Sequence, residues 1–127
     1  MSFTVKNLRD VDDAAAKGGF GETQEARFAH GDLDAESTGF SFHRVKPGKH
    51  QAFAHKHDDA EEVYVVVSGS GRIKIDDEVV DVQPLDAIRI SPGAVRQVEA
   101  GDEGVEYLAF GPRHDGDGEL IQEGFWE

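Results

Sequence analysis

The sequence predicts an all-β protein whose short antiparallel strands pack as a sandwich or a barrel. Short segments rich in β-branched and aromatic residues recur along the chain, and turn dipeptides such as Pro47-Gly48 separate them. The chain contains 15 glycines and few windows with helical periodicity, as is typical of a turn-rich β protein. Its 127 residues are enough for one hydrophobic core, so we expect a single domain over residues 1–127.

The strand signals are regular from Thr38 onward. Residues 62–67 read EVYVVV, and we expect this strand to stop at the glycine-rich stretch 68–71. Asp76-Asp77 is expected to form the turn of a hairpin. The expected strands, in order, are 39–45, 51–57, 62–67, 72–75, 78–82, 87–90, 95–100 and 105–110, with 101–104 as the connection between the last two.

Weaker patterns flank this region. In the N-terminal extension, residues 1–37, we expect a short strand at 3–5, one or two helical turns at 10–17 and a strand at 25–29. The C-terminal tail, residues 112–127, is rich in Gly and Asp and ends in an apolar Phe-Trp pair. We expect this pair to be buried against the barrel or a partner, with a lid over the barrel mouth as the alternative.

The charge balance is strongly acidic and excludes some partners. Asp and Glu number 26 against 13 Lys and Arg, for a net charge of −13. Nucleic acids and anionic membrane surfaces both require a basic footprint, so neither is an expected partner. The sequence has no Cys and therefore no disulfide or thiol nucleophile. No segment resembles a signal peptide or a membrane span, and a cytoplasmic protein is expected.

The most informative motif is His55-Lys56-His57 followed by Glu62. Two His at positions i and i+2 of a strand point to the same face, because side chains alternate across a strand. The acidic turn 58–61 returns the chain, so that Glu62 opens the next strand beside them. Two imidazoles and a carboxylate form a ligand set suited to Fe(II), Mn(II), Zn(II) or Ni(II).

The same alternation predicts which other residues share the interior. Gln51 and Phe53 fall on the face of the His pair, and Tyr64 falls on the face of Glu62. The opposite face of the 62–67 strand is also apolar, so we expect the N-terminal strand or a second subunit to cover it. We therefore predict a homodimer, in which this second face is formed by Val63, Val65 and Val67.

These residues resemble the first motif of the cupin family, G(X)5HXH(X)3,4E(X)6G. Gly48, His55, His57, Glu62 and Gly69 fall on it, with six residues in place of five before the first His. The four-residue gap between His57 and Glu62 and the six-residue gap between Glu62 and Gly69 are as in the family motif. The resemblance implies a single cupin β-barrel, a jelly roll of two antiparallel sheets, with its conserved core at about residues 38–111.

The second cupin motif, G(X)5PXG(X)2H(X)3N, is present in position but degraded. Only its second glycine is kept, as Gly93, and Asp86 stands where cupins often carry Asp. The residues that replace the other motif positions are Leu85, Ser91, Arg96 and Ala100. The position that supplies the third metal-binding His in the family is therefore occupied by Arg96.

Arg96 leaves two readings open, because a guanidinium cannot ligate a cation. In the first, a divalent metal binds His55, His57 and Glu62, while Arg96 clamps an anionic substrate group. In the second, Arg96 takes the place of the cation and pairs with Glu62, so that the site is metal-free. The first reading predicts metal-assisted, dioxygenase-like oxidation or isomerisation of a small polar or anionic substrate. The second predicts a non-catalytic module that binds a small ligand.

The expected site residues follow from these readings. We expect Arg96 and Tyr107 to be catalytic, since Tyr107 has inward parity and its hydroxyl needs a partner when buried. The residues expected to line the substrate pocket are Gln51, Phe53, Tyr64 and Arg96. Four further His lack spaced partners and are expected to be surface or packing residues: His30, His43, His50 and His114.

Overall fold

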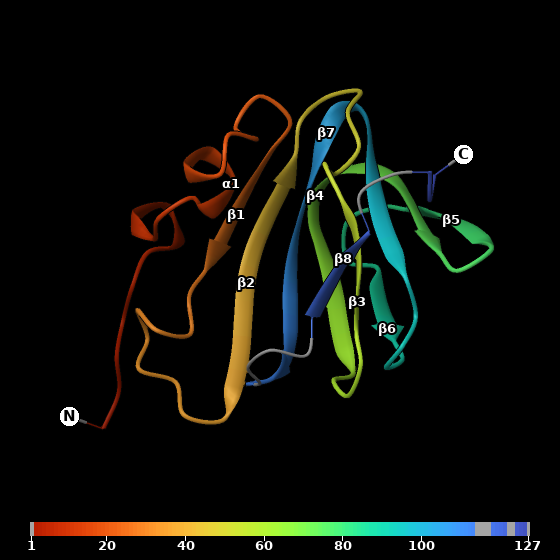
Figure 1. The fold of residues 1–127 in the computed structure, drawn as a ribbon. Helices are drawn as coiled ribbons and strands as arrows, with labels where there is room; N and C mark the ends of the chain where they lie inside the picture. Colours follow the sequence, from red (N-terminus) through yellow and green to blue (C-terminus); the bar gives the residue numbers. More distant parts are fainter. Residues whose placement is uncertain (1, 114–117, 122–123, 127) are drawn as a thin grey trace.

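A computed structural model describes residues 2–113, 118–121 and 124–126 and confirms the all-β class (Figure 1). Its helical elements are η1 (Leu8–Asp10) and α1 (Ala14–Lys17). Its strands are β1 (Gln24–Phe28), β2 (Thr38–Val45), β3 (Ala54–His57), β4 (Glu62–Ile75), β5 (Glu78–Val82), β6 (Ala87–Ile90), β7 (Arg96–Pro112) and β8 (Gly118–Ile121). No helix among the described residues is long and apolar enough to cross a membrane.

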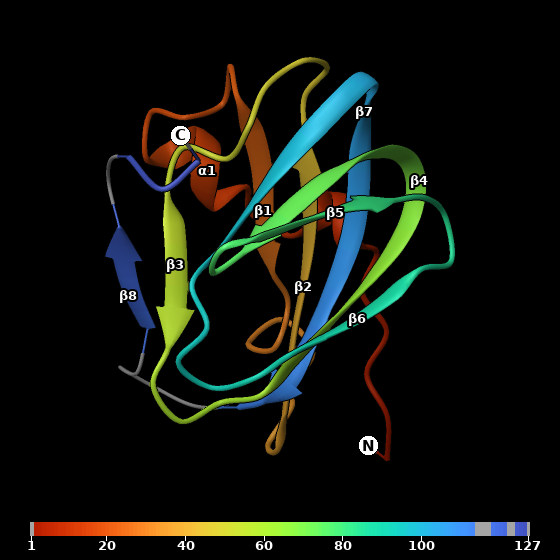
Figure 2. The same ribbon diagram turned by 90° about the vertical axis from the view of Figure 1, so that its right-hand side faces the viewer.

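The strands form one antiparallel sheet that curls into a barrel (Figure 2). One path runs β1-β2-β7-β3-β8, and β4 pairs with β5, β6 and β7 away from that path. The long strand β7 joins the two faces of the barrel. Its first residue, Arg96, pairs with both β3 and the end of β4, and its second half pairs with β2 and the start of β4.

Two expected strand breaks are wrong, because β4 and β7 run through their glycine-rich stretches. The stretch 68–71 lies inside β4, and 101–104 lies inside β7. The β4–β7 ladder shifts register on both sides of Gly69, as at a β-bulge. A Cβ built on Gly69 would overlap the carbonyl oxygen of Gly104. These glycines therefore allow two strands to approach closely and do not form turns.

The core fills the inside of the barrel. Tyr64 and Val66 of β4 are buried, whereas Val67 is 41% exposed, in agreement with the expected alternation. The rings of Tyr64 and Tyr107 lie 4.8 Å apart at the centre of the core. The other buried members of the core cluster are Val45, Ile73, Val82, Ile90, Val98, Ala100, Val105 and Ala109.

Within the N-terminal extension, α1 packs against β1 and β1 pairs with β2, away from the outer face of β4 (Figure 1). The expected strand at 3–5 is absent, and Val5 is 81% exposed. Asp13 caps α1 and also accepts a hydrogen bond of 3.0 Å from the amide of Ala26, which fastens the helix to β1. The extension therefore does not cover the apolar outer face of β4.

The C-terminal tail contains a strand that the sequence pattern did not indicate. Strand β8 pairs with the free edge of β3, and Gly118 lies opposite His57. Beyond it, Lys74 donates a hydrogen bond to the carbonyl of Phe125, and the Arg72 guanidinium lies 5.5 Å from the Trp126 ring centroid. The terminal aromatic pair thus rests on the β4 surface.

Candidate functional site

The two His of the motif share one face of β3. Their rings lie 5.2 Å apart at an interplanar angle of 85°. β3 is held on one side by β7, where His55 pairs with Arg96, and on the other by β8. The carbonyl of His57 accepts a hydrogen bond of 2.7 Å from the amide of Gly93, which ties the end of β3 to the turn before β7. The strand that carries both imidazoles is therefore fixed along its length.

Glu62 brings a carboxylate to this His pair. It is the first residue of β4, and its Oε1 lies 4.0 Å from His55 Nε2 and 3.5 Å from His57 Nε2. One ligand atom from each of the three residues can be chosen so that all lie within 4.8 Å of one another. The sequence spacing and the strand parity therefore do bring the predicted ligand set together.

Arg96 forms a buried ion pair with Glu62. Its side chain is 0% exposed, and its Nη2 donates to Glu62 Oε1. Its Nε donates to the Tyr64 hydroxyl at 3.4 Å and its Nη1 to the carbonyl of Ala94 at 3.1 Å. Burial disfavours the charge on Arg96, but Tyr64 and Glu62 outweigh that effect and raise the pKa of its guanidinium. All three nitrogens of Arg96 thus have protein partners.

The protonation states of the site follow from burial. Burial, and then the nearby Arg96 charge, lower the pKa of His55 from 6.5 to about 3. Its imidazole is therefore neutral at neutral pH, which is the form that binds metals. Burial raises the pKa of Tyr64 to about 12, with a further contribution from Glu62, so its hydroxyl stays protonated.

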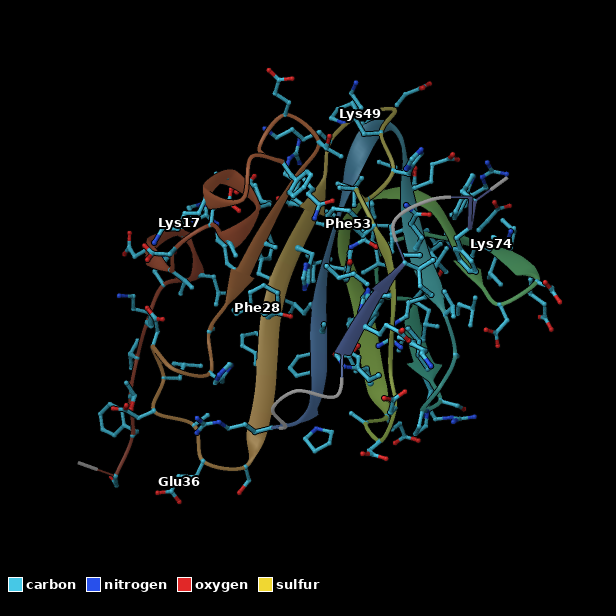
Figure 3. All side chains as sticks on the ribbon, viewed as in Figure 1. Lys17, Phe28, Glu36, Lys49, Phe53 and Lys74 are labelled. Carbon is cyan, nitrogen blue, oxygen red and sulfur yellow. The ribbon has the colours of Figure 1, made fainter. Side chains whose placement is uncertain are left out.

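These groups open into a cavity of about 440 Å³ inside the barrel. The expected lining residues Gln51, Phe53 and Tyr64 are all part of its wall. Phe28 of β1 adds a second phenyl ring, and Phe53 comes from the segment just before β3; both are labelled in Figure 3. Leu120 of β8 is another apolar residue of the wall. The volume is in the range of small-molecule pockets.

Arg96 and Tyr107 were expected to act in the pocket, but neither side chain is part of the cavity wall. Arg96 does not contact the cavity itself, but it donates hydrogen bonds to Glu62 and Tyr64, which both line it. Tyr107 lies in the core, where its hydroxyl accepts a hydrogen bond of 2.8 Å from Gln51 Nε2. Burial raises the pKa of Tyr107, which keeps that hydroxyl neutral. In this arrangement Tyr107 positions Gln51, and Arg96 positions Glu62.

Sequence reasoning missed part of the cavity wall. Ser41 and His43 of β2 line it, as does His30, although these His were expected to be surface or packing residues. His50 is exposed as expected, and His114 lies outside the described residues. Alternation along 39–45 places Ser41 and His43 on one face, and this signal could have identified the pair.

The donor set fits a divalent transition metal. Its two imidazoles and one carboxylate are the types of ligand such ions take, and His55 is neutral without any metal. A carboxylate ligand is usually hydrogen-bonded by a second residue, and Arg96 provides that bond to Glu62. The described residues offer three ligands in this group, so a bound ion would keep positions for water or substrate.

Comparison with known proteins identifies a family model and similar structures. The model described as Cupin domain matches residues 41–111. A cupin protein from Bacteroides fragilis has 22% identity and a TM-score of 0.71, covering 98% of this chain and 96% of that one. Oxalate decarboxylase from Bacillus subtilis has 23% identity and a TM-score of 0.73, covering 93% of this chain and 33% of that one.

A third similar structure is the polyketide cyclase RemF from Streptomyces resistomycificus. It has 17% identity and a TM-score of 0.75, and the match covers 95% of this chain and 87% of that one. No curated protein sequence matches this chain. At these identities the similar structures establish the barrel fold, and the chemistry must be argued from the site itself.

Proposed function

This chain belongs to the cupin family, and we propose that it is a small-molecule enzyme whose His55, His57 and Glu62 hold a divalent transition metal. One observation carries the proposal: these three residues bring their ligand atoms within 4.8 Å of one another in the wall of the barrel cavity. A bound Fe, Mn, Zn or Ni ion would supply Lewis-acid or redox chemistry there. The reaction we propose is the oxidation or isomerisation of a small polar or anionic substrate.

The protein's own residues have separable roles in this proposal. Arg96 donates to Glu62 Oε1, the same oxygen that lies nearest the two imidazoles, and so fixes the position of the carboxylate beside them. Phe53 and the neighbouring apolar wall give the apolar part of a substrate a surface to pack against. Gln51, fixed by Tyr107 and by its own bond to the amide of Val98 at 3.0 Å, offers a polar contact to the substrate.

The names of similar structures support a small-molecule substrate. One similar structure is an oxalate decarboxylase and another a polyketide cyclase, so barrels of this shape contain enzymes with quite different substrates. The fold therefore favours an enzyme without selecting its reaction.

A second candidate function rests on the Glu62–Arg96 ion pair. This pair already neutralises the Glu62 carboxylate within a buried environment. A protein that uses the pair in this way would be a metal-free cupin that binds a small ligand without turning it over. His55 and His57 would then act as hydrogen-bonding groups.

Metal content separates the two candidates. Protein purified without an affinity tag should contain about one transition-metal ion per chain in elemental analysis. His57→Ala should lose that metal, because it removes one of three ligands. His50→Ala is the matched control, since His50 is exposed and lies outside the cavity wall. Metal-free wild-type protein that still binds ligands tightly would instead establish the second candidate.

We also propose that the protein forms a homodimer through the outer face of β4. The N-terminal extension does not cover this face, where Val67 is 41% exposed. Phe110 of β7, which pairs directly with Val63, is 37% exposed. Apolar clusters of this kind mark interaction sites. Sedimentation at micromolar concentration should show a dimer, and Val65→Lys should convert it to a monomer; a wild-type monomer would refute this proposal.

A further inference from the structure

A second polar group lies in the cavity wall, outside the His-His-Glu set. The Ser41 hydroxyl and His43 Nε2 are 2.8 Å apart on the face of β2 that lines the cavity. The His43 ring stacks on Tyr107 at 4.9 Å between centroids and 16° between planes. It meets Phe28 edge-on at 5.7 Å. The imidazole is therefore held in place by two aromatic rings and a hydroxyl.

Among the described residues, the ring of His43 carries the one buried side-chain nitrogen or oxygen atom that has no hydrogen-bond partner. Its Nδ1 has no hydrogen-bond partner, while its Nε2 has Ser41. Such an unpaired buried group costs stability, so the position of this ring is not explained by hydrogen bonding within the fold alone. The orphan nitrogen is enclosed and Nε2 is bonded to Ser41, so the group of this pair that remains for a ligand in the cavity is the Ser41 hydroxyl.

The charge on this pair is defined by burial. The pKa of His43 is lowered from 6.5 to about 4, so the ring is neutral at physiological pH. A neutral imidazole bonded to a hydroxyl can accept or donate a hydrogen bond but does not attract an anion. The partner it fits is an uncharged oxygen group, a hydroxyl or a carbonyl.

The cavity wall also carries aromatic side chains. Phe28, Phe40, Phe53 and Tyr64 all line the cavity. Flat rings favour other flat rings through offset or edge-on contacts. A planar ring is therefore the shape that these walls accommodate best.

We propose that the cavity binds an oxygenated planar ring, such as a phenol or a cyclic enol, with one hydroxyl or carbonyl hydrogen-bonded to the Ser41–His43 pair. Another part of the ring system would then face His55, His57 and Glu62. The inference deepens the proposed function by naming the substrate class. The Ser41–His43 contact itself requires no metal.

The test uses two probes of matched shape, 4-nitrophenol and 4-nitrotoluene, which differ by a hydroxyl in place of a methyl group. Binding of each to the full-length protein is measured by equilibrium dialysis at mildly acidic pH, where the phenol keeps its proton. The quantity compared is the ratio of the two dissociation constants. One hydrogen bond is worth a factor of about three to ten in this ratio.

Wild-type protein should prefer the phenol, and Ser41→Ala and His43→Phe should each reduce the preference about threefold or more. Ser41→Ala removes a single oxygen atom, while His43→Phe keeps a flat ring against Tyr107. Ser68→Ala is the matched control: its hydroxyl bonds Glu106 and lies outside the cavity wall, so the ratio should not change.

Two results would overturn the inference. One is an equal preference in wild type and in both variants, which would make Ser41 and His43 purely structural. The other is that neither probe binds to wild type, which would exclude the ring class. Chelator-treated wild type serves to separate this inference from the metal proposal: it should keep the preference for the phenol even if elemental analysis finds no metal in the protein.

Discussion

His43 makes the pH dependence of stability a direct test of the cavity's structure. In the folded protein its pKa is about 4, against 6.5 in an unfolded chain. Between these values the unfolded state binds the proton more readily, so the free energy of unfolding falls as the pH falls from 6.5 toward 4. The loss of unfolding free energy that His43 causes reaches its full size below the pKa of about 4 in the folded protein, and it is absent above about pH 7.

The magnitude follows from the two pKa values. A full separation of this size corresponds to about 3 kcal/mol, and at pH 5 about 2 kcal/mol of it is already lost. His55, with its pKa lowered to about 3, adds a loss of similar size over the same interval. Comparison with His43→Phe isolates the His43 contribution, because the variant keeps a ring against Tyr107 but has no proton to bind.

Urea denaturation followed by circular dichroism at pH 7.5 and pH 5 measures this difference. Wild type should lose about 2 kcal/mol more than His43→Phe between the two pH values. The stability of the variant at pH 7.5 does not enter the comparison, since only the change with pH is used. Equal losses in the two proteins would show that His43 is solvated or protonated in the fold, and would refute the neutral Ser41–His43 pair.

Three further predictions concern the fold around the site. Arg96→Met should cost about 3–5 kcal/mol of unfolding free energy, because it leaves a carboxylate unpaired in the cavity wall. Lys17→Met, which breaks an exposed pair, should cost less than about 1 kcal/mol, and equal effects would contradict the burial argument. Gly69→Ala should destabilise by about 1–3 kcal/mol in a thermal melt, while Gly31→Ala, where an added Cβ meets nothing within 4 Å, should not. Deleting 124–127 should lower thermal stability or weaken the dimer; a change in ligand access alone would show that this segment is a lid.

The fold and the ligand set could be predicted because they depend on short-range alternation. His55 and His57 share a face through strand parity alone, and Glu62 follows them after a single turn. The family motif then assigns a barrel to the same residues. Both inferences need only a few neighbouring positions and no knowledge of distant contacts.

The misplaced strand breaks have a different cause. Gly in a sequence marks a turn or a close approach of two backbones, and the local pattern is the same for both. The bulged contact between Gly69 and Gly104 involves strands far apart in sequence, so it is visible only in the folded chain. Strand β8 was missed for a similar reason: its pairing with β3 is long-range, and its own residues carry few β-branched side chains.

The position of Arg96 also depends on long-range contacts that the local sequence pattern does not show. Its substitution for a family ligand was evident from the motif, and pairing with Glu62 was one of two expected arrangements. Its exclusion from the cavity wall depends on the Tyr64 ring and on the backbone of Ala94, which only the packed barrel brings together.

Cobalt titration tests the central claim most directly, because Co²⁺ takes the ligands of the other divalent ions and absorbs visible light when protein-bound. Metal-free wild-type protein should saturate at about one Co²⁺ per chain, with absorption bands typical of low coordination number. Glu62→Gln, which removes the charged ligand and leaves both imidazoles, should weaken binding at least tenfold. The absence of any bound-cobalt spectrum in wild type, or an identical titration in Glu62→Gln, would contradict a metal site formed by His55, His57 and Glu62.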